Sequence, residues 1–288
     1  ETGVVTPIDG QQVAVTLTAT IVKGTVTDTK AFTVKVGIPA LSDIEDVYAM
    51  ADGTTIKIKG ILSAMTKTGG YWMQDATAGI NIYASGAALT TIQGLALGVE
   101  IELVGELDIY RGLFEIAYIQ TVEVTNNTPA LPTPASINDV AFTNEGLLPY
   151  QGQLVSFEGF LLKADVNATT SSFNFDLYNP VNGKTIPVRV ESTVPGFADI
   201  VAFLNPLAVD SPINVVGAII GWYNNYQLAA TGAANFVAGT LSDDHKVALD
   251  AAAIEVPATV TEAGTLVLPA TGTNGSAIAW ASNNVLID

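Results

Sequence analysis

The chain contains no cysteine and only one histidine among its 288 residues. The lack of cysteine excludes disulfide bonds, thiolate nucleophiles and zinc–sulfur sites. The single histidine, His245, has no second histidine to share a metal with, and no hydrolase-type serine motif precedes it. We therefore expect His245 to be solvated or to cap a helix, and we predict no catalytic residue from it.

Basic residues are also scarce. Eleven Lys and Arg side chains stand against 28 Asp and Glu, which gives a formal net charge of −17. Proteins bind nucleic acid largely by releasing phosphate counterions with Lys and Arg, so this balance makes nucleic acid an unlikely partner. The acidic excess fits a soluble surface or weak binding of cations. The acids Asp43, Glu45 and Asp46 lie close together but lack the spacing of a calcium loop, so we predict a solvated helix start there and no metal site.

Long apolar runs are missing as well. No stretch approaches the ~20 residues that a membrane-spanning helix needs, and no basic segment followed by an apolar one resembles an export signal. The sequence shows no phosphate loop, no dinucleotide fingerprint and no pair of carboxylates that stands out for sugar hydrolysis. We expect no enzyme activity and no cofactor. Threonine-rich alternation with few charges is typical of an exported bacterial or archaeal protein, so we expect an extracellular or cell-surface location.

The sequence does contain segments in which apolar and polar residues alternate. Apolar side chains make up 49% and charged ones 14%, enough to form real cores. Residues 13–36 alternate around the turn at Lys23-Gly24-Thr25, which predicts an antiparallel hairpin. One face of this hairpin carries a set of apolar side chains: Val13, Val15, Leu17, Phe32 and Val34. Two strands cannot stand alone in water, so we expect another sheet to cover them.

The middle of the chain contains a pattern that occurs twice. Residues 41–124 hold a short helical turn and five or six short strands, with a loop near residues 89–97 between the third and the fourth. Residues 138–240 repeat this cycle, and the proline-rich stretch 125–137 separates the two. Each cycle is typical of a small closed barrel. The segments Tyr71-Trp72-Met73-Gln74-Asp75 and Gly79-Ile80-Asn81-Ile82-Tyr83 resemble the OB-fold domains that accompany secreted bacterial nucleases and other surface proteins.

The two ends of the chain complement each other. After a capped helix near residues 241–253, apolar runs follow that contain Leu266, Leu268, Ile278 and Trp280. Written tail to head, these runs and residues 1–38 resemble one atrophied bacterial Ig-like domain in permuted order. Neither this resemblance nor that to the OB-fold brings a catalytic residue, because both are accessory modules where they occur.

We therefore predict an all-β protein with two OB-like barrels in tandem and an Ig-like β-sandwich split between its N- and C-terminal halves. The expected segments are the C-terminal half of the sandwich (1–38), barrel 1 (41–124), the linker (125–137), barrel 2 (138–240), and a short helix with the N-terminal half of the sandwich (241–288).

This organisation predicts a structural role. The expected function is that of a subunit, or one repeat period, of an extracellular filament or surface fibre. Copies of the chain would join head to tail by completing the split sandwich. In an alternative closed variant, both ends of one chain meet. The predicted interface residues are Val13, Val15, Leu17, Phe32 and Val34 from the head, with Leu266, Leu268, Ile278 and Trp280 from the tail.

The alternative is an accessory module of a larger secreted enzyme, such as a nuclease, that recognises nucleic acid or glycan. Aromatic rings on the barrels could stack on bases or sugars. Because few basic side chains accompany them, core packing or interface anchoring is the favoured interpretation of these rings. The candidates are Tyr71, Trp72, Tyr110, Trp222 and Tyr223.

Overall fold

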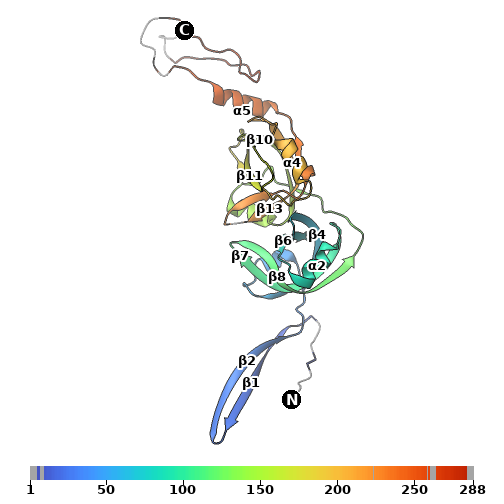
Figure 1. Cartoon of the computed structure of the whole chain (residues 1–288). Coiled ribbons are helices and arrows are strands. Elements are labelled where there is room, and N and C mark those ends of the chain that lie inside the picture. Colours follow the sequence, from blue (N-terminus) through green and yellow to red (C-terminus); the bar gives the residue numbers. More distant parts are fainter. Residues whose placement is uncertain (1–4, 7–9, 223, 258, 260–263, 284–288) are drawn as a thin grey trace.

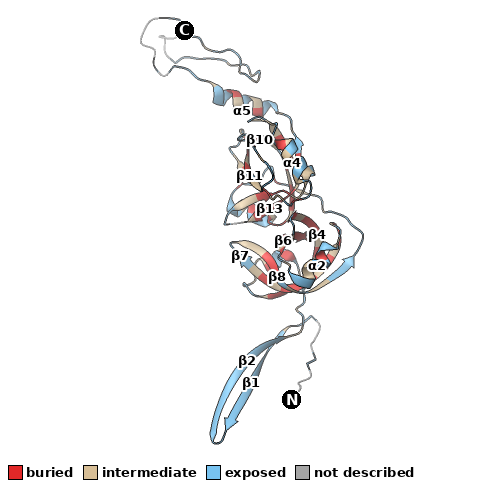
Figure 2. Cartoon of the chain, viewed as in Figure 1, coloured by how far each residue is buried: buried red, intermediate tan, exposed pale blue. Residues whose placement is uncertain are grey.

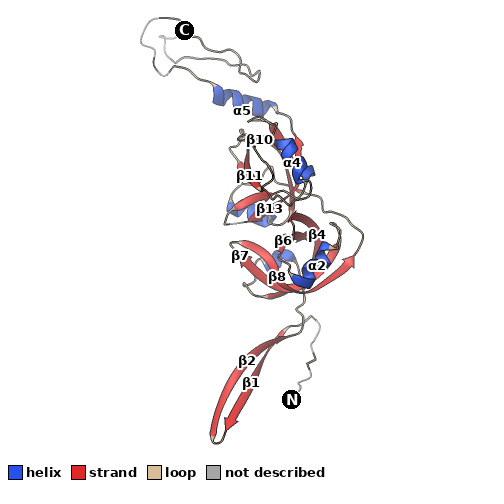
Figure 3. Cartoon of the chain, viewed as in Figure 1, coloured by secondary structure: helices blue, strands red, loops and turns tan. Residues whose placement is uncertain are grey.

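The computed structural model describes residues 5–6, 10–222, 224–257, 259 and 264–283. Figure 1 shows a hairpin at one end of the molecule, two barrels in the middle, and a helix with a tail at the other end. The structure is all-β in class, as predicted, and helices are confined to short segments beside the barrels and to the helix that precedes the tail (Figure 3).

The first barrel closes five strands in the OB order. Strand β4 pairs with β5 and β7, β5 pairs with β6, and β7 pairs with β8. Strands β6 and β8 close the barrel in parallel. Short strand β3 extends the sheet beside β4. The elements are β3 (Leu41–Ser42), α1 (Ile44–Val47), β4 (Thr55–Lys67), β5 (Gly70–Gln74), β6 (Gly79–Ile82), α2 (Gly86–Gln93), β7 (Glu100–Tyr110) and β8 (Leu113–Asn126).

The second barrel repeats this topology strand for strand. Strand β10 pairs with β11 and β13, β12 pairs with β11, and β14 lies antiparallel to β13 and parallel to β12. The repeat deduced from the sequence is therefore structural. Its elements are β9 (Ala135–Ser136), α3 (Asn144–Leu147), η1 (Leu148–Tyr150), β10 (Leu154–Leu162), β11 (Phe173–Tyr178), β12 (Thr185–Val190), α4 (Phe197–Leu204), β13 (Pro212–Trp222), β14 (Tyr226–Ala229), η2 (Ala233–Asn235) and β15 (Phe236–Ala238).

Each barrel has its own core, coloured red in Figure 2. Alternate residues of the strands point inward, as period-two patterning requires. Ile56, Ile58 and Leu62 of β4 belong to the core of barrel 1, and Val155 and Phe157 of β10 belong to that of barrel 2. Neither core includes a described residue beyond Phe236 or before Ile44.

The predicted loop at residues 89–97 is partly wrong, because helix α2 covers Gly86–Gln93. Its two threonines and its initial glycine have low helix propensity, which hid it in the sequence. Burial of Ile92 in the core of barrel 1 outweighs that propensity. Helix α4 occupies the same position in barrel 2 and also went unpredicted.

The N-terminal hairpin consists of β1 (Val13–Lys23) and β2 (Val26–Val36), which pair along their whole length. It projects from barrel 1, and its residues are exposed except for the half-buried Val36 at its base (Figure 2). At its base Lys35 Nζ donates to Thr55 Oγ1 over 3.1 Å and so ties the hairpin to barrel 1. Among the described residues, the hairpin forms a sheet of its own with two open edges.

At the opposite end, α5 (Asp243–Ala253) leads into the tail. Among the described residues of the tail, an isolated bridge joins Thr271 to Ala277 and no strand is formed. Hairpin and tail lie at opposite ends of the barrel pair (Figure 1), so the closed variant in which both meet within one chain does not occur in this structure. The split Ig-like sandwich remains a prediction about neighbouring copies.

The two barrels meet in a tight joint. Trp72 and Ala64 of barrel 1 form a small buried cluster with Leu154 and Ile219 of barrel 2. An ideal Cβ built on Gly79 would lie 2.2 Å from the backbone carbon of Gly152, closer than real side chains approach. Backbone thus packs on backbone at this point, which only glycine allows.

Buried amide side chains complete the joint. The fully buried Gln151 accepts from the backbone N–H of Phe114 over 2.7 Å and donates to the carbonyl of Gly112 over 3.2 Å. In the other direction, Gln74 accepts from the backbone N–H of Leu154 over 2.8 Å. Because unpaired buried amides are costly, these bonds hold one relative orientation of the barrels.

Candidate assembly surfaces

The predicted head residues share one face of the hairpin. Register pairs Val15 with Val34 and Leu17 with Phe32, so their side chains lie opposite each other on the same side. Leu17 is 55% exposed and Phe32 47% exposed, and Val13, Val15 and Val34 are exposed as well. We call these five residues the head face. An exposed apolar face of this kind on a two-stranded sheet is typical of an interaction surface.

The predicted tail residues also gather. Trp280 Nε1 donates to the carbonyl of Pro269 over 2.7 Å, and Ile278 N donates to the carbonyl of Ala270 over 2.9 Å. These bonds place residues 269 and 270 beside residues 278 and 280. We call residues 266–269 and 277–280 the two legs of the tail. Leu266, Leu268 and Ile278 are half-buried and Trp280 is 40% exposed. The legs therefore lie side by side, but nothing in the described chain covers Trp280 fully.

The two ends differ in charge. The hairpin, residues 13–36, carries Lys23, Lys30 and Lys35 against Asp28 alone. The helix and tail, residues 241–288, carry six acidic side chains against one lysine, Lys246. Opposite charge favours the encounter of hairpin and tail over that of two identical ends.

The candidate stacking aromatics are placed differently from one another. Trp72 and Tyr71 are buried, Trp72 in the joint and Tyr71 in the core of barrel 1, so their rings are closed to a ligand. Trp222 lies against the turn at Gly112, where its indole would contact any added Cβ. Tyr110 is 49% exposed. Tyr223 lies outside the described residues. Packing thus accounts for Tyr71 and Trp72. Tyr110 is the most exposed of the described candidates, and the guanidinium carbon of Arg111 lies 5.6 Å from its ring centroid.

His245 belongs to the capping box of helix α5, one of the two roles expected from the sequence, and it is buried rather than solvated. Its backbone N–H donates to Ser242 Oγ, and its Nδ1 accepts from the backbone N–H of Ser242 over 3.2 Å. Its Nε2 lies 2.8 Å from the carbonyl of Gly159. Because Nδ1 accepts, Nε2 carries the proton in this network and donates to barrel 2. The helix is thereby anchored to the second barrel.

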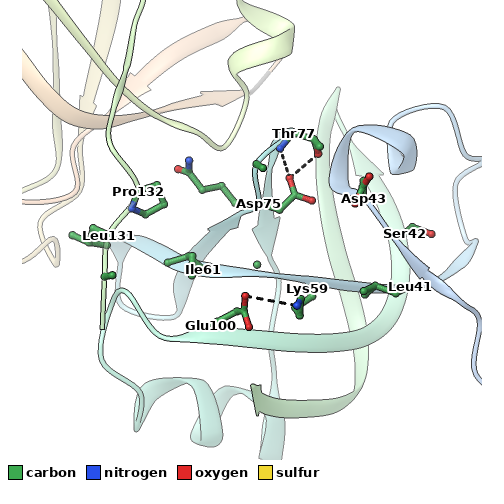
Figure 4. Close-up of a pocket in the computed structure, with 14 residues that line it drawn as sticks. Leu41, Ser42, Asp43, Lys59, Ile61, Asp75, Thr77, Glu100, Leu131 and Pro132 are labelled. Carbon is green, nitrogen blue, oxygen red and sulfur yellow. Dashed lines mark hydrogen bonds and ion pairs between the residues drawn. The ribbon is translucent and has the colours of Figure 1, made fainter. Parts of the chain in front are cut away.

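A cavity of about 440 Å³ lies on barrel 1 beside the linker (Figure 4). Leu131 and Pro132 of the linker face Ile61 across it, and the ion pair of Lys59 with Glu100 (3.8 Å) lines its floor. Asp75 points at its rim but accepts from Thr77 and from the N-terminus of α1. No buried side-chain nitrogen or oxygen of the described chain lacks a partner. The described lining of the cavity therefore offers no buried unpaired side-chain polar atom that would define a ligand.

Within the described part of the chain, no group of three or more His, Asp or Glu side chains is placed to hold a metal ion. The helices described there are all too short or too polar to cross a bilayer.

Barrel 1 holds a carboxyl group with unusual ionisation. Glu115 of β8 is buried and lies directly across from Asp108 of β7. Burial, then repulsion by Asp108 and a hydrogen bond with it, raises the pKa of Glu115 to about 7, although Lys67 opposes the shift. The folded protein therefore binds a proton here between pH 4.5 and about 7 that the unfolded chain releases.

We expect Glu115→Gln to stabilise the protein at pH 8 by on the order of 2 kcal/mol and to leave its stability unchanged at pH 4. In the wild type, the stability that protonated Glu115 contributes is fully present below pH 4.5. It is lost as the pH rises through about 7, because ionised Glu115 faces Asp108 without full solvation. Urea unfolding of both proteins from pH 4 to 8 measures the difference. Glu123→Gln, which removes the same charge at an exposed position of β8, should show no such trend.

No protein-family model matches the chain, and no curated protein matches it. Solved structures do match. The hypothetical protein YgiW from E. coli has 18% identity and a TM-score of 0.26, over 30% of this chain and 90% of that chain. A murine DNA-binding protein bound to double-stranded DNA has 7% identity and a TM-score of 0.31, over 67% of this chain and 99% of that one.

A replication protein A heterotrimer bound to single-stranded DNA matches at 7% identity and a TM-score of 0.23, over 78% of this chain and 75% of that chain. At such TM-scores these likenesses carry no weight for the function of this chain. The strand order itself defines the class: the protein is a tandem OB-fold protein with a projecting hairpin and a terminal tail.

Proposed function

We propose that the protein is a structural unit of an extracellular filament or surface fibre, in which the head face of one copy packs on the tail legs of the next. The copies are separate subunits or consecutive periods of one longer chain. The observation that carries the proposal is the head face, five apolar side chains exposed on a two-stranded sheet that pairs with no other described strand. Two strands of this kind are marginal in water, and a second sheet would stabilise them.

The tail of a second copy is the occupant favoured by three features. It carries the opposite charge to the hairpin. Its legs carry apolar side chains that are only half-buried in their own chain. It lies at the far end of the barrel pair from the hairpin, which makes the contact heterologous (Figure 1). A heterologous contact continues as a filament unless the rotation between copies closes a ring.

The barrels would serve this assembly as a rigid spacer. The joint at Gly79 and Gly152 is backbone against backbone, and buried glutamine amides bridge it. A rigid spacer holds head and tail in a constant relative orientation, so that each added copy presents the same geometry to the next.

The test is the size of the purified chain under native conditions, compared with its mass after denaturation. Sedimentation velocity over a concentration series should show a ladder of species that grows into filaments visible by electron microscopy, all reverting to 29.9 kDa on denaturation. A chain that stays monomeric at its highest soluble concentration would contradict the proposal. On material from the source cells, a denatured mass many times larger would identify the covalent form.

A further inference from the structure

The turn between the tail legs is held by one carboxylate of helix α5. Asp250 is almost fully buried, although it is charged. Its Oδ1 accepts from the backbone N–H of Asn274 over 2.8 Å, from Asn274 Nδ2 over 2.9 Å and from Thr273 Oγ1 over 3.2 Å. Its Oδ2 accepts from the backbone N–H of Ser276 over 3.0 Å. Both oxygens are thus engaged by the turn.

The fit around Asp250 is close. An ideal Cβ on Gly272 would lie 2.2 Å from the Asp250 carboxyl carbon, so the carboxylate rests directly on the glycine. Burial of Asp250 opposes its ionisation, but hydrogen bonds from Ser276 and Asn274 more than offset this and hold its pKa below the ordinary range. The carboxylate therefore stays charged and bonded throughout the physiological pH range.

Two hydrogen-bonded residues of α5 connect the turn to barrel 2. Asp250 joins it to α5, and His245 joins α5 to the Gly159 carbonyl of barrel 2. The legs leave the turn from Thr271 and Ala277, which form a β-bridge. The carboxylate thus links the turn to the helix across 23 to 26 residues of the chain.

We propose that Asp250 is a positioning residue for assembly: it presents the two tail legs as a pre-formed pair to the head face of a second copy. The inference depends on the proposed function, because it concerns how the same contact is prepared. Pre-organisation raises affinity by removing ordering cost before the encounter, and it adds no contact with the partner. Loss of Asp250 should therefore weaken assembly without changing the geometry of the polymer.

The experiment compares two pairs of full-length variants. Asp250→Ala removes the carboxylate, and Asp244→Ala removes the same charge at an exposed position of α5. Gly272→Ala displaces the carboxylate while keeping its charge, and Gly264→Ala adds a methyl group where no atom lies within 4 Å. We expect Asp250→Ala and Gly272→Ala to raise the concentration needed for assembly at least about tenfold, as a loss of some 1.4 kcal/mol would. The two controls should assemble like the wild type.

A second readout separates positioning from folding. Fluorotryptophan labelling gives Trp280 its own ¹⁹F resonance, assigned with Trp280→Phe. Below the assembly concentration this resonance should shift in Asp250→Ala and Gly272→Ala, while those of Trp72 and Trp222 stay unchanged. Above the raised concentration both variants should form filaments with the wild-type repeat.

If the wild type assembles and Asp250→Ala and Gly272→Ala assemble equally well, the inference is overturned and the proposed function stands. An equal loss in Asp244→Ala would overturn it too, because the effect would then be one of charge. A wild-type chain that never assembles would instead overturn the proposed function, and the inference with it.

Discussion

A chain without residues 254–288 is expected to remain monomeric at every concentration while both barrels stay folded. The deletion removes both tail legs and leaves α5 complete. Neither barrel core includes a described residue beyond Phe236, so the loss should not reach them. Trp280→Ala is expected to act in the same direction, because it removes a large half-exposed ring from the surface that we propose to meet the head face. Sedimentation velocity and thermal unfolding measure the two effects.

The reciprocal change is made on the hairpin. Leu17→Lys combined with Phe32→Lys places two charges at one cross-strand pair of the head face. Burial of each side chain against a neighbour would contribute about 1.5–3 kcal/mol, so this variant should lose assembly completely. The matched control is Thr18→Lys, which adds a charge to the opposite face of the same strand.

Mixing the two defective proteins gives the sharpest result. The deletion variant keeps its head face, and the hairpin variant keeps its tail legs. Together they can form one contact and no second one, so we expect 1:1 heterodimers and nothing larger. Filaments from either variant alone would show that assembly uses other surfaces. A mixture without heterodimers would show that the head face and the tail do not meet.

Much of the fold could be predicted from local sequence patterns. The hairpin at residues 13–36, the strands of both barrels and the capping role of His245 follow from alternation, turn residues and helix-start chemistry. Helices α2 and α4 could not be predicted, because Ile92 and Ile200 become buried only once the barrels have closed. Propensity within an eight-residue window does not contain that information.

The candidate site, too, could be predicted from the sequence only in part. The apolar head residues follow from period-two alternation, and the structure places all five on one exposed face. Gln151 and Asp250 gave no local signal, since an amide or a carboxylate in a short polar stretch looks like surface. Their roles come from partners 37 and 24 residues away. The repeated strand pattern could have indicated that Gly79 begins a strand and that Gly152 lies in a turn, but not that they touch.

Gly79→Ala is expected to separate the two barrels while leaving each of them folded. The added Cβ would meet only backbone of barrel 2, namely the carbonyl carbon and oxygen of Gly152 and the nitrogen of Gln153. Backbone cannot rotate away as a side chain does, so the joint must open, at a cost of about 1–3 kcal/mol or more. The buried amide of Gln151 then loses partners in barrel 1, which adds to the penalty.

Thermal unfolding should change from one transition to two, and protease should cut the stretch between β8 and β9 faster. The matched control is Gly221→Ala on β13 beside the joint, where the nearest atoms lie 3.8 Å from the added Cβ. If both variants unfold in a single transition like the wild type, the backbone contact at Gly79 is not what couples the barrels. If the coupling is real, Gly79→Ala filaments should lose their regular repeat even though the head face and the tail legs are unaltered. Regularity of the fibre would then be a property of one glycine contact in the middle of the chain, far from the surfaces that bind.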